Sequence, residues 1–195
     1  MAIPTFTLDT NCIIDIDEGR PNAGYIQQLV QAHNEGTASV ALIAMSASES
    51  QKSGRQLDSF AEFTERTAAL GLGALEMVYP MFIFDISYWD NALWTDEKGI
   101  QLQRVIHKIL FPTIPDEWES YCSAHGVAPL VIDAYHFKKW KNALCDVQAY
   151  WAHANAKRDV FVTQDCNFLK SKKQSLISLC GGRIETPAAA TALLI

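Results

Sequence analysis

The sequence predicts an α/β protein in which helices flank a mainly parallel sheet. Short apolar runs of strand length recur along the chain, among them 5–9, 40–44 and 160–163. Between these runs, apolar residues repeat every three or four positions, which is the period of an amphipathic helix. Strands that alternate with helices are joined by crossovers, and such crossovers place successive strands parallel to one another.

The first expected element is a buried strand at 5–9, followed by a turn. Pro21 then suits the first position of a helix, and Gly36 suits the cap at its end. Between the two, the spacing i, i+3, i+4 and i+7 of an amphipathic helix is found at Ile26, Leu29, Val30 and His33. A second buried strand is expected at 40–44.

The next helix is expected to start at Ser46, because residues 46–49 have the S-x-x-E form of a capping box. It should run to the glycines at 71 and 73. A third strand is expected at either 75–79 or 81–84, since Pro80 separates the two options. The single domain, 1–195, would carry a helical insertion or a lid within 71–142.

The second half of the chain alternates in the same way. The expected elements are a helix around 102–109 that ends at Pro112, a connecting segment at 111–132, a helix that opens at Asp146, a strand at 160–163, a helix around 176–179 and a last strand at 183–186.

Composition narrows the class of protein. Apolar residues make up 49% of the chain and charged residues 19%, and no apolar run reaches the length of a membrane helix. The five cysteines are widely spaced and include no C-x-x-C pair, which favours free thiols in a reducing cytoplasm over a zinc site or disulfides. We therefore expect a cytoplasmic protein with no membrane partner.

Charge is distributed unevenly along the chain. The net charge is −6, yet residues 130–173 hold eight basic and four acidic residues, so that this segment is +4 and the remainder −10. A polyanion would be attracted to the basic segment. Lys170, Lys172 and Lys173 follow Asp165 closely and are the predicted contacts for a substrate backbone. The alternative is a solvated helix face.

Four acidic residues lie near the ends of apolar runs. Asp9, Glu49 and Asp165 follow strand-like runs, and Asp146 lies 19 residues before Asp165. Ligands bind at the carboxyl ends of the strands in an open parallel sheet. Carboxylates gathered there repel one another unless a cation lies between them, and an all-oxygen site suits Mg²⁺ or Mn²⁺. This pattern indicates metal-assisted phosphodiester chemistry, in which these four carboxylates are the metal ligands.

The chain resembles the PIN-domain nucleases in three ordered segments. Residues 8–15 read L-D-T-N-C-I-I-D, like the opening motif of that family, and residues 162–168 read V-T-Q-D-C-N-F, like its motif near the C-terminus. Asp146 stands at the family's usual interval before Asp165. The resemblance spans residues 5–187.

The resemblance implies a Rossmann-like, three-layer fold with a Mg²⁺- or Mn²⁺-dependent endoribonuclease site. It carries the acidic roles onto Asp9, Glu49, Asp146 and Asp165, and it makes Asn11 and Thr163 helpers that orient a carboxylate or a water. Single-stranded RNA is the implied substrate, and an antitoxin protein or a second copy of the chain are candidate partners. The stretch between Glu49 and Asp146 is longer than in the compact toxin members of the family.

Each acidic residue also has a structural explanation. Asp9 fits a helix N-cap if Thr10 opens a helix, and Glu49 fits the capping box of Ser46. Asp146 fits an acid near a helix start, where the macrodipole favours it, and Asp165 fits a turn. Asp15 and its acidic neighbours are expected to be solvated, on a turn before a helix.

Two other functions compete with the nuclease. A phosphatase of the haloacid dehalogenase type needs D-x-D after a strand, and Asp15-Ile16-Asp17 follows an apolar run. Alternatively, a catalytically inert PIN-like domain would bind RNA or protein. Stabilisation by Mn²⁺ would separate an active metal site from an inert module.

Overall fold

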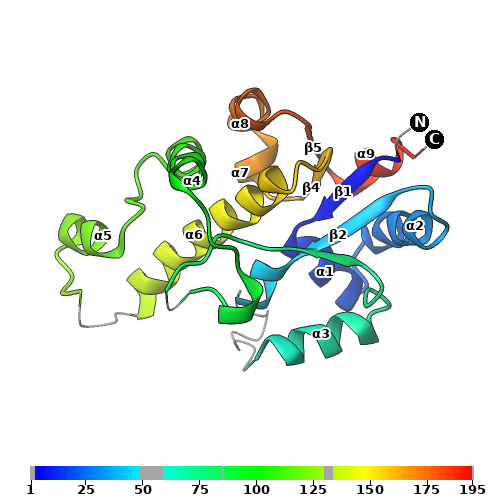
Figure 1. The fold of residues 1–195 in the computed structure, drawn as a ribbon, viewed down its shortest axis with the longest axis horizontal. Helices are drawn as coiled ribbons and strands as arrows, with labels where there is room; N and C mark the ends of the chain where they lie inside the picture. The colour runs from blue at the N-terminus through cyan, green and yellow to red at the C-terminus, as the bar shows by residue number, and fades with distance from the viewer. Residues whose placement is uncertain (1–2, 49–58, 85, 130–133, 195) are drawn as a thin grey trace.

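The computed structural model describes residues 3–48, 59–84, 86–129 and 134–194, and its centre is a five-stranded sheet (Figure 1). The strand order is β3-β2-β1-β4-β5, and every pairing is parallel. This confirms the predicted α/β class and its flanked parallel sheet. The strands are β1 (Thr5–Leu8), β2 (Ser39–Ile43), β3 (Glu76–Val78), β4 (Val160–Val162) and β5 (Arg183–Glu185).

Helices connect the strands and cover the sheet. The α-helices are α1 (Thr10–Asp17), α2 (Ala23–Asn34), α3 (Phe60–Ala69), α4 (Glu97–Leu110), α5 (Trp118–His125), α6 (Ala134–Asn155), α7 (Cys166–Leu169), α8 (Lys173–Cys180) and α9 (Pro187–Thr191). Two 3₁₀ helices are η1 (Ala44–Ser48) and η2 (Trp89–Asn91).

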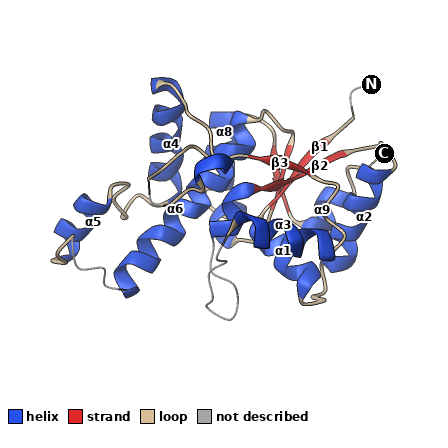
Figure 2. Cartoon of the chain, turned by 60° about the horizontal axis from the view of Figure 1, so that its bottom comes forward, coloured by secondary structure: helices blue, strands red, loops and turns tan. Residues whose placement is uncertain are grey.

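The sheet separates two hydrophobic cores, because successive side chains of a strand point to opposite faces. Phe6, Leu8 and Leu42 pack with α1, α2 and α3 in one core. Ile43 and Phe161 pack with α4, α6 and α8 in the other. Figure 2 shows the strands enclosed between helices on both sides. Because both faces are covered, the inner strands β2 and β4 are almost entirely apolar, whereas the edge strands β3 and β5 begin at the exposed residues Glu76 and Arg183.

The N-terminal half departs from prediction in three places. Helix α2 begins at Ala23, so Pro21 lies in the turn before it and not at its first position. The residues after β1 form helix α1 instead of a turn, with Asp9 as its N-cap. Helix α3 begins at Phe60, where the extended backbone of Ser59 and its side-chain bond to Glu62 N–H form the N-cap. It therefore does not start at Ser46, which lies in η1.

Residues 71–142, the range expected to hold an insertion or a lid, contain β3, η2, α4, α5 and the beginning of α6. Helix α4 packs along α6, whereas α5 lies at the end of the molecule farthest from the sheet (Figure 1). The third strand is the first of the two predicted options, and Met81 beyond it forms only an isolated bridge with Leu93. In the described part of the chain, no helix is long and apolar enough to cross a membrane.

Candidate active site

The sheet reverses its direction of growth between β1 and β4. From β1 the chain adds β2 and then β3 on one side, and it returns to add β4 and β5 on the other. In open parallel sheets, ligands bind in the crevice beyond the carboxyl ends of the two strands at such a switch point. Asp9 directly follows β1 and Thr163 directly follows β4. The predicted residues of these two motifs therefore meet at the place where the topology favours a ligand.

Asp9 is held by three hydrogen-bond donors. Its Oδ1 accepts from the backbone N–H of Thr10 at 2.8 Å, which caps α1. Its Oδ2 accepts from the amide of Asn11 and from the hydroxyl of Thr163, both at 2.6 Å. A carboxylate offers about four acceptor positions, so these bonds leave one on Oδ1. The helix-cap explanation for Asp9 is correct as local structure, and it leaves one acceptor position for a ligand.

The environment of Asp9 favours its protonated form. The pKa of this carboxyl is raised to about 6. Burial is the main cause and the charge of Asp165 adds to it, whereas the bonds from Thr163, Thr10 and Asn11 act in the opposite direction and lower the pKa. Burial opposes the charged form because it removes water from the carboxylate. A nearby cation would act in the opposite direction and favour the charged form.

Thr163 and Asn11 join the two motifs. The hydroxyl oxygen of Thr163 accepts from the backbone N–H of Asp165 and from the Asn11 amide, both at 3.0 Å. The side-chain oxygen of Asn11 accepts from the N–H of Gln164 at 3.2 Å. These contacts fix the position of Asp9 relative to the chain that carries Asp165.

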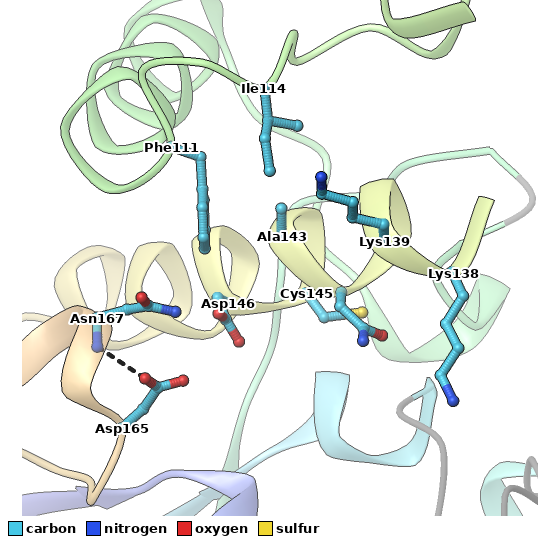
Figure 3. A pocket seen from close by; sticks show the side chains of 10 residues that line it. Phe111, Ile114, Lys138, Lys139, Ala143, Cys145, Asp146, Asp165 and Asn167 are labelled. Atoms are coloured by element: carbon cyan, nitrogen blue, oxygen red, sulfur yellow. Dashed lines mark hydrogen bonds between the residues drawn. The ribbon is translucent and has the colours of Figure 1, made fainter. Parts of the chain in front are cut away.

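Asp165 and Asp146 face a common cavity of about 550 Å³. Asp165 is the N-cap of α7, where it accepts from the N–H of Asn167 at 2.7 Å, and its second oxygen points into the cavity (Figure 3). The carboxylate of Asp146 points toward the same space from α6. Both side chains are half-buried. The cavity is lined by Phe111, Ile114, Lys138, Lys139, Asn142, Ala143, Cys145, Asp146, Asp165 and Asn167.

Asp146 does not lie near a helix start. Helix α6 extends from Ala134 to Asn155, so Asp146 occupies its middle. The macrodipole acts only within the first and last turns of a helix, so the explanation of Asp146 as a charge at a helix start is wrong. From this position on α6 its carboxylate points into the cavity that Asp165 also lines.

The predicted lysine contacts lie outside this cavity. Lys170 and Lys172 are absent from its described lining, and Lys173 forms an ion pair with Glu185 of β5 at 3.2 Å. Lys138 and Lys139 line the cavity instead. They precede Asp146 by eight and seven positions, so a helix prediction extended upstream of Asp146 would have placed them on its face.

Asp15 differs from its expected solvated state. It is 1% exposed, accepts from the amide of Gln164 and pairs with Arg20 at 3.5 Å. Asp15 and Asp17 both lie in helix α1, whereas the phosphatase motif must follow a strand. The structure therefore contradicts the haloacid dehalogenase interpretation and gives Asp15 a structural role in holding the segment that precedes Asp165.

The remaining predicted ligand, Glu49, lies outside the described residues. Within the described ranges, no three His, Cys, Asp or Glu side chains form a group able to hold a metal ion. Asp146 and Asp165 nevertheless fit Mg²⁺ or Mn²⁺ in kind, because Mg²⁺ is usually held by one or two carboxylates, several waters and the substrate phosphates. Neither imidazole nor a second thiol joins Cys145 in the described lining, so the donors do not resemble a zinc site.

Comparison with known proteins finds no matching family model, curated protein or solved structure. Function is therefore inferred from the chemistry of the site and from its place in the fold.

Proposed function

We propose that this chain is a metal-dependent ribonuclease of the PIN-domain type, which hydrolyses phosphodiester bonds of single-stranded RNA at the cavity that Asp146 and Asp165 face. The observation that carries the proposal is the position of these two carboxylates. Both point into one cavity beside the switch point between β1 and β4, and Asp9 lies close enough for the charge of Asp165 to raise its pKa.

Asp146 and Asp165 would hold Mg²⁺ or Mn²⁺, and Asp9 would add negative charge behind them. A divalent ion bound there supplies a Lewis acid that stabilises the charge developing on the phosphoryl oxygens. The protein contributes geometry: the N–H of Asn167 fixes one oxygen of Asp165, and Thr163 fixes both Asp9 and the N–H of Asp165. Two carboxylates, one within α6 and one at the N-cap of α7, would orient the ion, and the substrate phosphate with it.

The test is cleavage of a fluorescently labelled single-stranded RNA by the full chain. We expect cleavage in Mg²⁺ or Mn²⁺, none in EDTA, and a loss of about a hundredfold or more in Asp146→Asn and Asp165→Asn. Asp90→Asn is the matched control, because Asp90 is exposed in η2 and lies outside the cavity lining. Equal activity of Asp165→Asn and the unmodified chain would make the site assignment wrong.

The same variants separate an enzyme from an inert PIN-like binding module. Binding of an ion to the folded state raises the melting temperature. We expect Mn²⁺ to raise the Tm of the unmodified chain and of Asp90→Asn, and to have little effect on Asp165→Asn. RNA binding with neither cleavage nor stabilisation by Mn²⁺ would favour the inert module.

A further inference from the structure

The cavity extends along one face of helix α6. Lys139, Asn142 and Asp146 are spaced i, i+3 and i+7, so they lie on the same side of the helix. At a rise of 1.5 Å per residue, Lys139 and Asp146 are separated by about 10 Å along the helix axis. A ligand that reaches from the acidic residues to the lysines must therefore be longer than a single phosphate group.

The two ends of the cavity carry opposite charge. Asp146 and Asp165 form the acidic end, and Lys138 lies at the other end with its ammonium group directed away from them (Figure 3). Lys138 and Lys139 are exposed, and within the described ranges neither forms an ion pair with a carboxylate. Two cations are thus available to a negatively charged ligand whose other end lies at the acidic pair.

One wall of the cavity is apolar. Phe111 and Ile114 come from the end of α4 and the loop after it, and both are half-buried. Figure 3 shows them facing α6 across the cavity. An aromatic ring beside a cationic groove is a common way to hold single-stranded nucleic acid, because an unpaired base stacks on the ring while the groove follows the backbone.

We propose that Lys138 and Lys139 form a phosphate-binding subsite that holds the RNA backbone two to three nucleotides from the bond that is cut. The phosphates of a stacked strand recur about every 3.4 Å along its axis, so about 10 Å corresponds to two or three nucleotides. The inference rests on the proposed nuclease function and deepens it, because it makes the enzyme dependent on the length of its substrate. Lys138 and Lys139 are positioning residues, and they take the role predicted for Lys170, Lys172 and Lys173.

The experiment measures kcat/KM on a series of oligouridylates from two to eight nucleotides. We expect kcat/KM to rise with length up to about four nucleotides and then to level off. In the double variant Lys138→Ala/Lys139→Ala, we expect kcat/KM on the octamer to fall by about ten- to a hundredfold, mainly through a higher KM. The dinucleotide should be cut at an unchanged rate, because it is too short to reach the lysines.

Salt dependence gives a second readout that does not need turnover. Each phosphate contact to a single strand contributes about 0.7 to the slope of log K against log salt concentration. Fluorescence anisotropy with the octamer in EDTA should therefore show a slope about 1.4 smaller in the double variant. Lys170→Ala/Lys172→Ala removes the same charge outside the cavity lining and is the matched control, with a smaller expected change in both assays.

The two proposals can fail separately. Cleavage with the same length dependence in the Lys138→Ala/Lys139→Ala variant would overturn the subsite and leave the nuclease standing. Weaker octamer binding and a smaller salt slope in that variant, in a protein that cuts no RNA, would overturn the nuclease and support the subsite as part of a binding groove.

Discussion

The hydroxyl of Thr163 donates a 2.6 Å hydrogen bond to Asp9 across the boundary between β4 and β1. The same oxygen accepts from the backbone N–H of Asp165 at 3.0 Å. One side chain that is fully buried therefore sets the position of Asp9 and the path of the chain that carries Asp165. The two acidic motifs, 156 positions apart, are connected through a single oxygen atom.

Replacing Thr163 by valine removes this connection while keeping the shape of the side chain. We expect Thr163→Val to lower the free energy of unfolding by about 1–3 kcal/mol, because a buried carboxylate loses a donor and the N–H of Asp165 loses its acceptor. The pKa of Asp9 should rise above 6, since the Thr163 bond lowers it. Urea denaturation and an NMR titration of the Asp9 carboxyl measure the two effects. Thr163→Ser keeps the hydroxyl and should retain both values, and a valine variant that matches the unmodified chain would show that the bond contributes nothing.

Asp9 should also give the stability of the protein a measurable dependence on pH. The folded chain keeps a proton on Asp9 up to about pH 6, whereas the ordinary pKa of 3.8 applies when it unfolds. Between these values the folded state binds more protons, so the free energy of unfolding falls as the pH rises. The loss is about 1.4 kcal/mol per pH unit, or about 3 kcal/mol across the window.

Asparagine at position 9 cannot titrate, which isolates this contribution. We expect the free energy of unfolding of the unmodified chain, relative to Asp9→Asn, to fall by about 3 kcal/mol between pH 3.8 and pH 6. Above pH 6 the difference should be constant. Urea denaturation at several pH values measures it. The Asp90→Asn control should give a curve parallel to that of the unmodified chain, and a parallel curve for Asp9→Asn would contradict the raised pKa.

The strands could be predicted closely from the sequence. Each lies within one residue of its expected ends. The inner strands β2 and β4 are covered on both faces, so that they form short, almost continuous apolar runs that are easily found in the sequence. Helix α1 was not predicted, because contacts that are distant in the sequence stabilise it. Its buried positions include the polar residues Thr10 and Asp15, whose partners Ser46 and Gln164 lie far away in the sequence. The local sequence around α1 gives no information about these two contacts.

Part of the candidate site could also be predicted from the sequence, and part could not. The locations of Asp9, Thr163 and Asp165 could be predicted, because all three residues belong to short motifs that directly follow strands. The lysines of the cavity were missed because the helix was expected to open at Asp146, and α6 begins twelve positions earlier. Lys173 was assigned to substrate, whereas it pairs with Glu185 of a strand that follows the helix. Sequence proximity to Asp165 does not determine which cations face the cavity.

His153 should give the stability of the protein a pH dependence opposite to that of Asp9. It is buried on α6, its Nδ1 lies 2.9 Å from the hydroxyl of Thr7, and burial together with the charge of Arg158 lowers its pKa to about 3. The unfolded chain takes up a proton near pH 6.5, so stability is lost as the pH falls below that value, by about 1.4 kcal/mol per unit down to about pH 3.

The variant His153→Gln removes that titration and retains a group that can bond to Thr7. Below pH 6.5, its free energy of unfolding should fall less steeply than that of the unmodified chain. The effects of Asp9 and His153 oppose each other between about pH 4 and pH 6, so we expect their sum to be nearly flat there. The two single variants should therefore tilt the profile in opposite directions in urea denaturation, and a tilt in the same direction would contradict one of the two pKa values.

Arg158 joins three strands at the edge of the sheet opposite the site. Its guanidinium donates to the carbonyl oxygens of Phe6 in β1 and Ser39 in β2, at 3.1 and 2.8 Å, and pairs with Glu76 of β3 at 3.2 Å. The Arg158 side chain is 9% exposed, whereas that of Glu76 is 63% exposed. The bonds to the carbonyl oxygens should therefore stabilise the sheet, and the ion pair should contribute little.

We expect Arg158→Lys to lower the free energy of unfolding by about 2–3 kcal/mol, because a lysine keeps the charge but cannot reproduce the planar fork that reaches two strands at once. Glu76→Gln removes only the exposed ion pair and should change stability by less than about 1 kcal/mol. Urea denaturation at pH 7.5 compares the two. Specific activity per folded molecule should be unchanged in both variants, since this edge lies away from Asp146 and Asp165. If Glu76→Gln were as destabilising as Arg158→Lys, the ion pair would be the main contact, and the bonds to the strand carbonyls would be secondary.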